Sequence, residues 1–551
     1  MKKAIVLAIL LLALTVVTGF TVTASHTIPV IVQAENVETA VTVAQSYGAQ
    51  VHEQLDIINA VSADLPQTQL AALSADSRVV QVIVDDKATI ASGGGFGTPP
   101  DSYSPEVMGV DQVWDSGITG SGVTVAVIDT GIAFHPNASQ YILARYDALD
   151  NGPLRPDPHG HGTMMTSIIG NPSEDSDGYL GVAPNVKYVD VRVLDENGSG
   201  TYTDIIEGLN WVLANKDAYN IRVANLSLVA SIEGPYWDNP INQAVEALWD
   251  AGVVVVAAAG NGGPNALTIA TPGNDPFIIT VGAFTDNYTP ADESDDYVTP
   301  FSGAGPTESG FIKPDVIAPG AHIITMARPS AAWPQEHPDA HLYGYYYEIA
   351  GTSASSAAVS GVVALMLQAN PDMTPNQVKY ALMTSARPAT YADGTLAWSV
   401  YQQGTGRVWA PAAVLTPPAG EANGNMVPGE AYVGPVVYRD GQFRLVDEAG
   451  ETIPDADSYI WDGTYDSSAS GYAWVGGYAW VGGYAWVGGY AWVGSFDWIP
   501  LETGDNWQSG YTWAGEEGWV GGYAWVGGYA WVGGYAWVGN YILPALLDAS
   551  E

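Results

Sequence analysis

The sequence predicts an α/β protein built on a parallel β-sheet with helices on both faces. A small α+β unit is expected before it and a β-rich repeat region after it. Short apolar strands alternate with amphipathic helices from residue 101 to 415, which is typical of a parallel sheet covered on both faces. A βαββαβ order fits into about sixty residues before this region. A six-residue unit rich in glycine and aromatic residues recurs near the end of the chain.

The first 24 residues have the pattern of an export signal. Lys2 and Lys3 precede the apolar run Ala4–Val17, and the small residues Val22-Thr23-Ala24 follow it. A membrane anchor is the alternative, but the uninterrupted apolar stretch is shorter than the ~20 residues that span a bilayer. We therefore expect a secreted, extracellular protein, with attachment to the cell surface as the alternative.

Composition limits the partners of the chain. The 551 residues include 59 acidic and 17 basic side chains, giving a formal net charge of -42. Nucleic acid is not expected as a partner, because phosphates need Lys and Arg opposite them. The absence of cysteine excludes disulfides and thiolate metal sites. Export without cysteine favours a bacterial origin.

Residues 25–91 form the predicted α+β unit, and the Gly- and Pro-rich stretch 92–100 reads as a linker. Apolar spacing locates three of the four strands of the βαββαβ order and both of its helices. The strands are Thr27–Val32, Ile57–Ala63 and Val79–Val84, and the helices are Val37–Ser46 and Leu65–Leu73.

The main α/β domain is expected over 101–415. Its predicted strands are Val123–Ile128, Val186–Val193, Val223–Leu228, Val253–Ala258 and Ile278–Val281, and its predicted helices include Ile205–Ala214 and Ile241–Trp249. Thr374 to Gln377 has the form of a capping box with proline at the first helical position. Residues 416–470 indicate only a linker and a few strands.

Three short segments supply the chemistry. Asp129 ends an apolar strand, His161 precedes Gly-Thr, and Ser353 follows Gly-Thr at the start of a helix of small residues. Serine needs a base to become a nucleophile, histidine can serve as base and then as acid, and a carboxylate can hold the imidazole in one tautomer. Each residue alone is weak support, but the order Asp, His, Ser is one of the known orders of such triads. His159 is a local competitor of His161, but it lacks the Gly-Thr that follows His161.

The chain resembles the subtilisin-like serine proteases, or subtilases, over about 101–415. The resemblance rests on the three triad segments and on Gly181-Val182-Ala183-Pro184, Ala259-Gly260-Asn261, Phe301-Ser302, Gly305-Pro306 and Lys313 to Gly320. It implies a serine endopeptidase with a subtilisin-like fold that acts on peptide and protein substrates and needs no cofactor for chemistry. It also implies that the N-terminal unit is a propeptide that inhibits the enzyme until the precursor is processed.

The resemblance assigns further site residues. Asn261 is expected to donate its amide to the oxyanion together with the Ser353 backbone N–H. Substrate is expected to pair with the strand Gly198, Ser199 and Gly200, and Ser227, Leu228 and Val229 to start one wall of the first specificity pocket. Two departures stand out. The family's proline after the nucleophile is absent from Ala354-Ser355-Ser356-Ala357, and Val229-Ala230 stands where glycines are usual, which is expected to narrow or reshape the pocket.

The resemblance also allows structural calcium. Two acidic clusters, Glu174–Gly178 and Asp292–Asp296, concentrate oxygen ligands. Neither has EF-hand spacing, and a solvated acidic loop is the favoured interpretation of both.

Residues 471–541 form the repeat region, and 542–551 a tail. Tyr-Ala-Trp-Val-Gly-Gly begins at Tyr472, Tyr478 and Tyr484 and again at Tyr523 and Tyr529, with imperfect copies between. Tyr and Trp would share one face of a short strand, and glycine pairs would turn the chain. A hairpin meander or a β-solenoid both fit. A structural, self-associating module is favoured over binding to a surface polymer.

These observations predict a secreted, autoprocessing subtilisin-like endopeptidase. The alternative from another class is a surface structural or adhesive repeat protein whose protease domain serves mainly its own processing.

Overall fold

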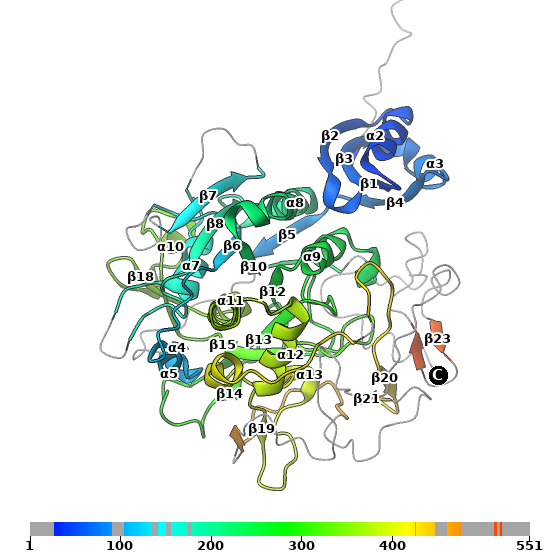
Figure 1. The fold of residues 1–551 in the computed structure, drawn as a ribbon. Coiled ribbons are helices and arrows are strands. Elements are labelled where there is room, and N and C mark those ends of the chain that lie inside the picture. Colours follow the sequence, from blue (N-terminus) through cyan, green and yellow to red (C-terminus); the bar gives the residue numbers. More distant parts are fainter. Residues whose placement is uncertain are drawn as a thin grey trace, which may run out of the picture. The chain divides into compact units, whose positions relative to one another are not determined.

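The structure is a computed structural model, and part of the chain lies outside what it describes (Figure 1). It describes residues 27–90, 104–134, 141–149, 156–174, 178–232, 234–424, 426–446, 460–470, 472–474, 512–514 and 518–520. The predicted export signal 1–24, the predicted linker 92–100, most of the predicted repeat region and the predicted tail 542–551 therefore lie outside the described residues.

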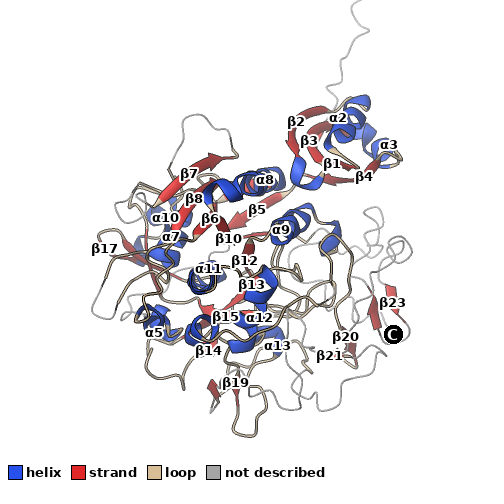
Figure 2. Ribbon diagram, viewed as in Figure 1, coloured by secondary structure: helices blue, strands red, loops and turns tan. Residues whose placement is uncertain are grey.

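The described chain separates into two compact units, the first ending at Asp85 and the second beginning at Asp86. The second unit is built on a sheet of order β14-β13-β12-β10-β6-β8-β7, with β15 also pairing with β13 (Figures 1 and 2). Every pairing in it is parallel except that of β14 with β13, so the predicted parallel sheet is confirmed. The strands are β6 (Thr124–Asp129), β7 (Ile142–Asp147), β8 (Lys187–Arg192), β10 (Ile221–Leu226), β12 (Val254–Ala258), β13 (Ile279–Thr285), β14 (Tyr297–Val298) and β15 (Val316–Pro319).

Helices cover both faces of this sheet. α7 (His161–Gly170) and α11 (Thr352–Ala369) contact one another on one face, and α8 (Tyr202–Tyr219) and α9 (Pro240–Asp250) contact one another on the other (Figure 1). The predicted capping box is present at α12 (Pro375–Ser385), where the Thr374 side chain accepts from the Gln377 N–H. α11 is long and apolar enough for a membrane span, but 89% of it is buried inside the protein, so it serves as a core helix.

An ion cluster lies inside the second unit. Lys313 Nζ is 2.7 Å and Lys379 Nζ is 3.2 Å from the carboxylate of Asp315, and all three side chains have no exposed surface. Lys379 also donates to the carbonyls of Pro276 and Ile278. Burial lowers the pKa of Lys379 to about 7.

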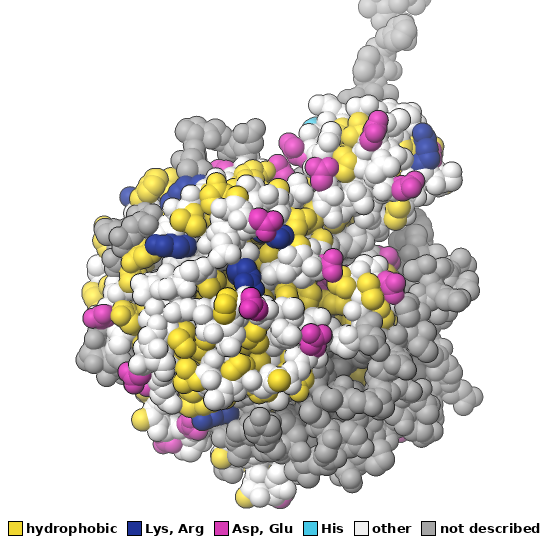
Figure 3. Space-filling view, in the orientation of Figure 1, with side chains coloured by type: hydrophobic (Ala, Val, Ile, Leu, Met, Phe, Trp, Pro, Cys, Tyr) yellow, Lys and Arg dark blue, Asp and Glu magenta, His cyan; other side chains and the backbone are white. Residues whose placement is uncertain are grey.

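On the face shown in Figure 3, Lys and Arg are scattered among acidic and uncharged side chains rather than gathered in a broad patch.

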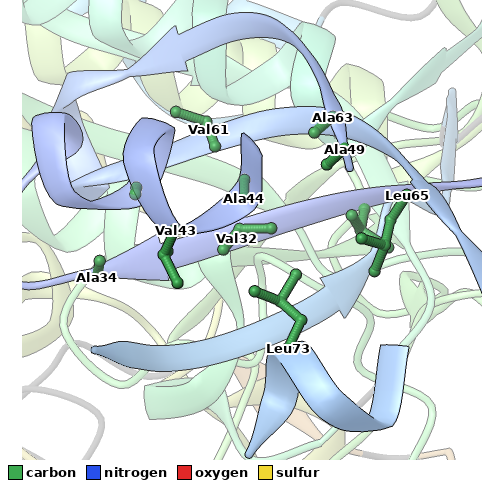
Figure 4. Close-up of a cluster of buried hydrophobic side chains, with 11 residues drawn as sticks. Val32, Ala34, Val43, Ala44, Ala49, Val61, Ala63, Leu65 and Leu73 are labelled. Atoms are coloured by element: carbon green, nitrogen blue, oxygen red, sulfur yellow. The ribbon is translucent and has the colours of Figure 1, made fainter. Parts of the chain in front are cut away.

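The first unit has the expected βαββαβ order, and its antiparallel sheet runs β2-β3-β1-β4. Valine, alanine and leucine side chains from the strands and both helices form its core, including Val32, Val43, Val61, Leu65 and Leu73 (Figure 4). The elements are β1 (Thr27–Ala34), α2 (Val37–Ser46), β2 (Gln50–Leu55), β3 (Ala60–Pro66), α3 (Leu70–Ser74) and β4 (Val79–Val84).

The predicted helix 37–46 and strand 79–84 are found at the expected residues. The strand expected at 57–63 begins only at Ala60, because Asp56–Ile58 forms a 3-10 turn that ends in the left-handed Asn59. The helix expected at 65–73 is reduced to a 3-10 turn and the short α3.

The described part of the region 416–470 belongs to the second unit. β20 (Val436–Arg439) and β21 (Gln442–Leu445) form a hairpin, and Trp461 stacks on Tyr401 with ring centroids 5.7 Å apart. Two short pairs involve the repeat. β22 (Ala473–Trp474) pairs with β19 (Ala389–Thr390), and β23 (Thr512–Ala514) pairs with β24 (Gly518–Val520).

Candidate active site

Asp129 and His161 are brought together at the carboxyl edge of the sheet. Asp129 ends the buried strand β6 and His161 begins α7. His161 Nδ1 lies 2.8 Å from Asp129 Oδ1 and 3.0 Å from Oδ2, and both side chains are almost wholly buried. Because the carboxylate can only accept, Nδ1 carries the proton and Nε2 presents a lone pair. Nε2 is buried and has no hydrogen-bond partner among the described residues.

Asp157 holds the two segments together, and the sequence did not reveal it. Its Oδ1 accepts from Thr130 Oγ1 at 2.7 Å and from Gly160 N at 2.6 Å, and its Oδ2 accepts from the N–H and the hydroxyl of Thr163. Thr130 follows Asp129, and its Oγ1 also accepts from Gly162 N at 2.9 Å. Burial raises the pKa of Asp157, and the four hydrogen bonds oppose this shift.

Gly162 shows how close these segments lie. A Cβ on it would lie 2.2 Å from the carbonyl oxygen of Gly131, so a larger residue would push α7 away from the end of β6. The only signals for Asp157 in the sequence are its place four residues before His161 and the turn-forming residues after it.

Ser353 is the second residue of α11, the helix that packs against α7. It is 1% exposed, and its Oγ donates to the carbonyl of Ser227 at 3.1 Å. Its own carbonyl accepts from Ser227 Oγ and Ser356 Oγ at 3.0 and 2.9 Å. The proline that the family has after the nucleophile is absent here, and α11 still runs unbroken through Ala357.

Asn261 is oriented by the residue beside the nucleophile. Its Oδ1 accepts from the N–H of Thr352 at 3.0 Å and from Thr352 Oγ1 at 2.9 Å. These two hydrogen bonds fix the orientation of the Asn261 amide, with Oδ1 on Thr352 and Nδ2 on the opposite side of the group. Nδ2 is buried and has no hydrogen-bond partner among the described residues. An unpaired buried donor costs about 1–3 kcal/mol, so this N–H group is suited to donate a hydrogen bond to a ligand oxygen.

The predicted substrate strands flank a segment of the chain itself. β5 (Lys87–Ile90) lies between β9 (Ser199–Thr201) and β11 (Leu228–Ala230) and is antiparallel to both. Thr89 is opposite Ser199 on one side and Val229 on the other, and Ile90 N donates to Gly198 O at 3.2 Å. An extended peptide therefore fits between these two strands, and β11 begins directly after Ser227.

The space between β9 and β11, which β5 occupies, is called the groove below. Its walls explain why position 198 is a glycine and where the Val229 side chain lies. Gly198 has φ +70°, and a Cβ on it would lie 3.2 Å from His159 Nε2, so a side chain there is disfavoured. A Cβ on Gly260 would lie 3.6 Å from Val229 Cγ1, which places the valine side chain opposite the Gly260–Asn261 segment. His159 is buried, and burial lowers its pKa to about 4, with the nearby His161 ring adding to the effect. His159 is therefore neutral near pH 7, and it is His161 that lies within hydrogen-bonding distance of Asp129.

The carboxylates of the cluster 292–296 are engaged by other side chains. Within the part of the chain that the structure describes, no group of three or more His, Cys, Asp or Glu is placed to hold a metal ion. In 292–296, Asp296 pairs with Arg407 at 2.9 Å, Glu293 also pairs with Arg407, and Asp295 accepts from Thr289. These carboxylates do not fit a calcium site. Asp175–Asp177 of the other cluster lies outside the described residues.

Comparison with known proteins bears on the family and the fold. The model of the subtilase family matches residues 120–406. Serine protease AprX of Bacillus subtilis is 39% identical over 287 residues, which cover 51% of this chain and 64% of AprX. Subtilisin E of the same organism is 32% identical over 342 residues, or 62% of this chain and 78% of subtilisin E.

Among solved structures, fervidolysin from Fervidobacterium pennivorans, described as a keratinolytic enzyme related to subtilisin, has a TM-score of 0.58 at 20% identity. The match covers 80% of this chain and 75% of that one, and it supports the fold. With the parallel sheet and the paired Asp129 and His161, these matches show that the chain belongs to the subtilase family of serine-type endopeptidases.

Proposed function

We propose that the chain is exported, that it cleaves extended polypeptides with Ser353, His161 and Asp129, and that it removes its own N-terminal unit. The observation that carries the proposal is the position of β5 between the two predicted substrate strands, next to Ser227. The carbonyl of Ser227 accepts from the Ser353 hydroxyl.

The chemistry follows from the groups present. The Ser353 hydroxyl turns from the Ser227 carbonyl toward His161 Nε2 and passes its proton to that nitrogen as Oγ attacks the substrate carbonyl carbon. Asp129 stabilises the imidazolium through Nδ1. The tetrahedral oxyanion accepts from Asn261 Nδ2 and from the Ser353 N–H at the start of α11. His161 then protonates the leaving amine as the C–N bond breaks, and water repeats the sequence on the acyl-enzyme.

Self-processing is proposed at the first peptide bonds after Ile90. β5 joins the N-terminal unit covalently to the groove, so the chain presents its own extended segment at a very high effective concentration. After the cut, β5 retains its strand pairings, and the released N-terminal product competes with substrate for the groove. This accounts for the inhibitory propeptide expected at 25–91.

The test compares secreted wild type with Ser353→Ala by N-terminal sequencing. Wild type is expected to begin within a few residues after Ile90, and Ser353→Ala to retain β5. Ser355→Ala is the matched control, because Ser355 lies in the same helix and donates to the backbone carbonyls of Ala318 and Pro319. It is expected to process normally. Processing of Ser353→Ala at the same bond would contradict the proposal.

A second measurement separates a general protease from a repeat protein that only processes itself. The processed protein is treated with a serine-directed fluorophosphonate and offered an unrelated unfolded protein. Labelling at Ser353 together with cleavage of the unfolded protein is expected. Labelling without cleavage would assign the site to self-processing alone.

A further inference from the structure

The first unit of the repeat is seated on the catalytic unit. Tyr472 is 6% exposed. It packs in a cluster with buried side chains from α4 (Ser104–Val107), β13, β14, β15 and β19. The cluster comprises Val107, Phe284, Val298, Ile317, Ala389 and Trp398. These elements belong to the enzyme rather than to the repeat, so the enzyme supplies the side chains that bury the Tyr472 ring. These side chains are called the tyrosine pocket below.

Aromatic contacts hold the Tyr472 ring in position. Tyr472 meets Trp398 at 6.2 Å between centroids and 76° between planes, and Tyr391 at 6.4 Å and 81°. Both are edge-to-face arrangements, which aromatic pairs favour. Trp398 is itself held by Tyr465, stacked at 5.4 Å. Burial raises the pKa of Tyr472 to about 12, in keeping with a largely desolvated site.

The backbone after Tyr472 adds a strand to the enzyme. Ala473 lies opposite Thr390 and Trp474 opposite Ala389, in antiparallel register. β19 is also held by other parts of the enzyme. The Ala389 N–H donates to Gln403 Oε1 at 2.9 Å, its carbonyl accepts from Ala397 N at 2.9 Å, and Thr390 forms an antiparallel bridge with Leu396. A side-chain pocket combined with strand addition is a common way of recognising a short peptide.

The same three residue types recur in the later repeats. Tyr-Ala-Trp begins again at Tyr478, Tyr484, Tyr523 and Tyr529. The other two strands described in this region, β23 and β24, occupy the positions of Ala-Trp-Val in the repeat, and they pair with each other with Trp513 opposite Trp519. A unit of the repeat thus pairs with the enzyme at β22, and two imperfect copies pair with each other at β23 and β24, where β24 also contacts β20.

We propose that the pocket around Trp398 together with β19 is a binding site for one Tyr-Ala-Trp unit of this chain. Its resident is Tyr472-Ala473-Trp474, and it recognises the unit by sequence. The site anchors the repeat array to the enzyme at one end and leaves the later units to pair with one another. If Tyr472 is removed, the next unit, beginning at Tyr478, takes its place.

Disulfide trapping tests this directly, because the chain has no cysteine of its own. Residues opposite each other in an antiparallel pair have Cβ atoms about 4.5–5.5 Å apart, close to what a disulfide needs. Thr390→Cys is combined with Ala473→Cys, or with Ala479→Cys in the second unit. All variants are made in the full chain with Ser353→Ala to prevent autolysis. Mild oxidation and peptide mapping by mass spectrometry identify the bond formed.

The 390–473 pair is expected to cross-link within one chain, and the 390–479 pair only weakly. Adding Tyr472→Ala is expected to reduce the 390–473 bond by about tenfold or more, since loss of a buried aromatic ring weakens an interaction at least that much. The same change is expected to raise the 390–479 bond. Tyr472→Phe keeps the ring contacts and should cross-link like the wild-type sequence.

Each other outcome would overturn the proposal. Unchanged 390–473 bonding in Tyr472→Ala would mean that the tyrosine pocket does not hold the strand. Loss of that bond without a gain at 479 would mean that the site does not recognise the unit's sequence. Disulfide-linked dimers as the main product would assign the site to a unit of a second copy.

Discussion

Asp157→Asn tests whether the turn before His161 is held by its hydrogen bonds. The Asp157 carboxylate accepts four of them, two at each oxygen. In asparagine, Oδ1 can keep Thr130 Oγ1 and Gly160 N, but the new NH2 faces the N–H and hydroxyl of Thr163. The hydroxyl can rotate to accept. The Thr163 N–H cannot, and a buried donor without a partner costs about 1–3 kcal/mol.

Two effects oppose each other in this substitution. Burial raises the pKa of Asp157, so removing the charge relieves part of the cost of burying it. The four donors face fixed positions, however, and the mismatch at Thr163 remains at every pH. We expect the mismatch to dominate, either as lost stability or as a displaced turn. If the turn moves, kcat falls by roughly 5- to 150-fold, the rate equivalent of that energy.

The assay separates these two outcomes. The free energy of unfolding is measured in denaturant on Ser353→Ala proteins with and without Asp157→Asn. kcat and KM are measured on processed enzyme whose active sites are counted with a fluorophosphonate. We expect a fall in kcat with KM within about twofold, because the four hydrogen bonds of Asp157 go to Thr130, Gly160 and Thr163 rather than to the substrate strands. Glu308→Gln is the control for the kinetic measurement only, because it removes a buried carboxylate elsewhere and is expected to change stability in its own right.

An unchanged kcat per titrated site, with or without lost stability, would refute the reasoning that Asp157 positions His161. A rise in KM with kcat unchanged would also contradict it, because that pattern indicates a disturbed groove.

Three further predictions follow from the same contacts. Asn261→Ala is expected to lower kcat by about 10²–10³ with little change in KM, the loss typical of one oxyanion donor; a KM effect alone in steady-state kinetics would contradict this. Val229→Gly is expected to raise kcat/KM for peptides with a large residue before the cut relative to those with a small one, and an unchanged ratio across a peptide series would contradict the placement of Val229 in the pocket wall. For Glu308, burial raises the pKa from 4.5 to about 7, so its protonated form stabilises the fold below about pH 4.5 and that stabilisation is lost as pH rises through 7. Glu308→Gln should therefore leave the unfolding free energy unchanged at pH 4.5 and raise it by up to roughly 3 kcal/mol at pH 8; equal effects at both pH values would refute this.

The sequence predicted those helices and strands whose apolar residues follow a regular local spacing and also form the core. α2 and β4 have apolar spacing that also serves the core, and they were found at the predicted residues. β2 was not predicted, because Gln50–Leu55 is largely polar and exposed and is fixed by pairing with β3. The sheet of β16 (Ile323–Met326), β17 (His341–Tyr343) and β18 (Tyr346–Ile349) was missed for the same reason, since its pairings rather than its pattern define it.

The residues of the candidate site likewise fall into those that a local motif predicted and those that no local pattern revealed. Asp129 and His161 were identified from short motifs with characteristic neighbours, and the structure places them within hydrogen-bonding distance. Asp157 and Thr352 act through hydrogen bonds to residues distant in sequence, as with the 91-residue separation between Thr352 and Asn261. No local pattern encodes such a partner. The occupation of the groove by β5 depends likewise on two strands that are more than a hundred residues away from it in the chain.

The buried ion cluster has a practical consequence for anyone attaching a probe to this enzyme. Beyond residue 26 the chain has only five lysines, Lys87, Lys187, Lys216, Lys313 and Lys379. Lys313 and Lys379 are sealed in the interior around Asp315, and Lys87 lies upstream of the proposed cut. Amine-reactive dyes or resins would therefore couple at Lys187, Lys216 and the new terminal amine, which limits labelling to three amines without any engineering.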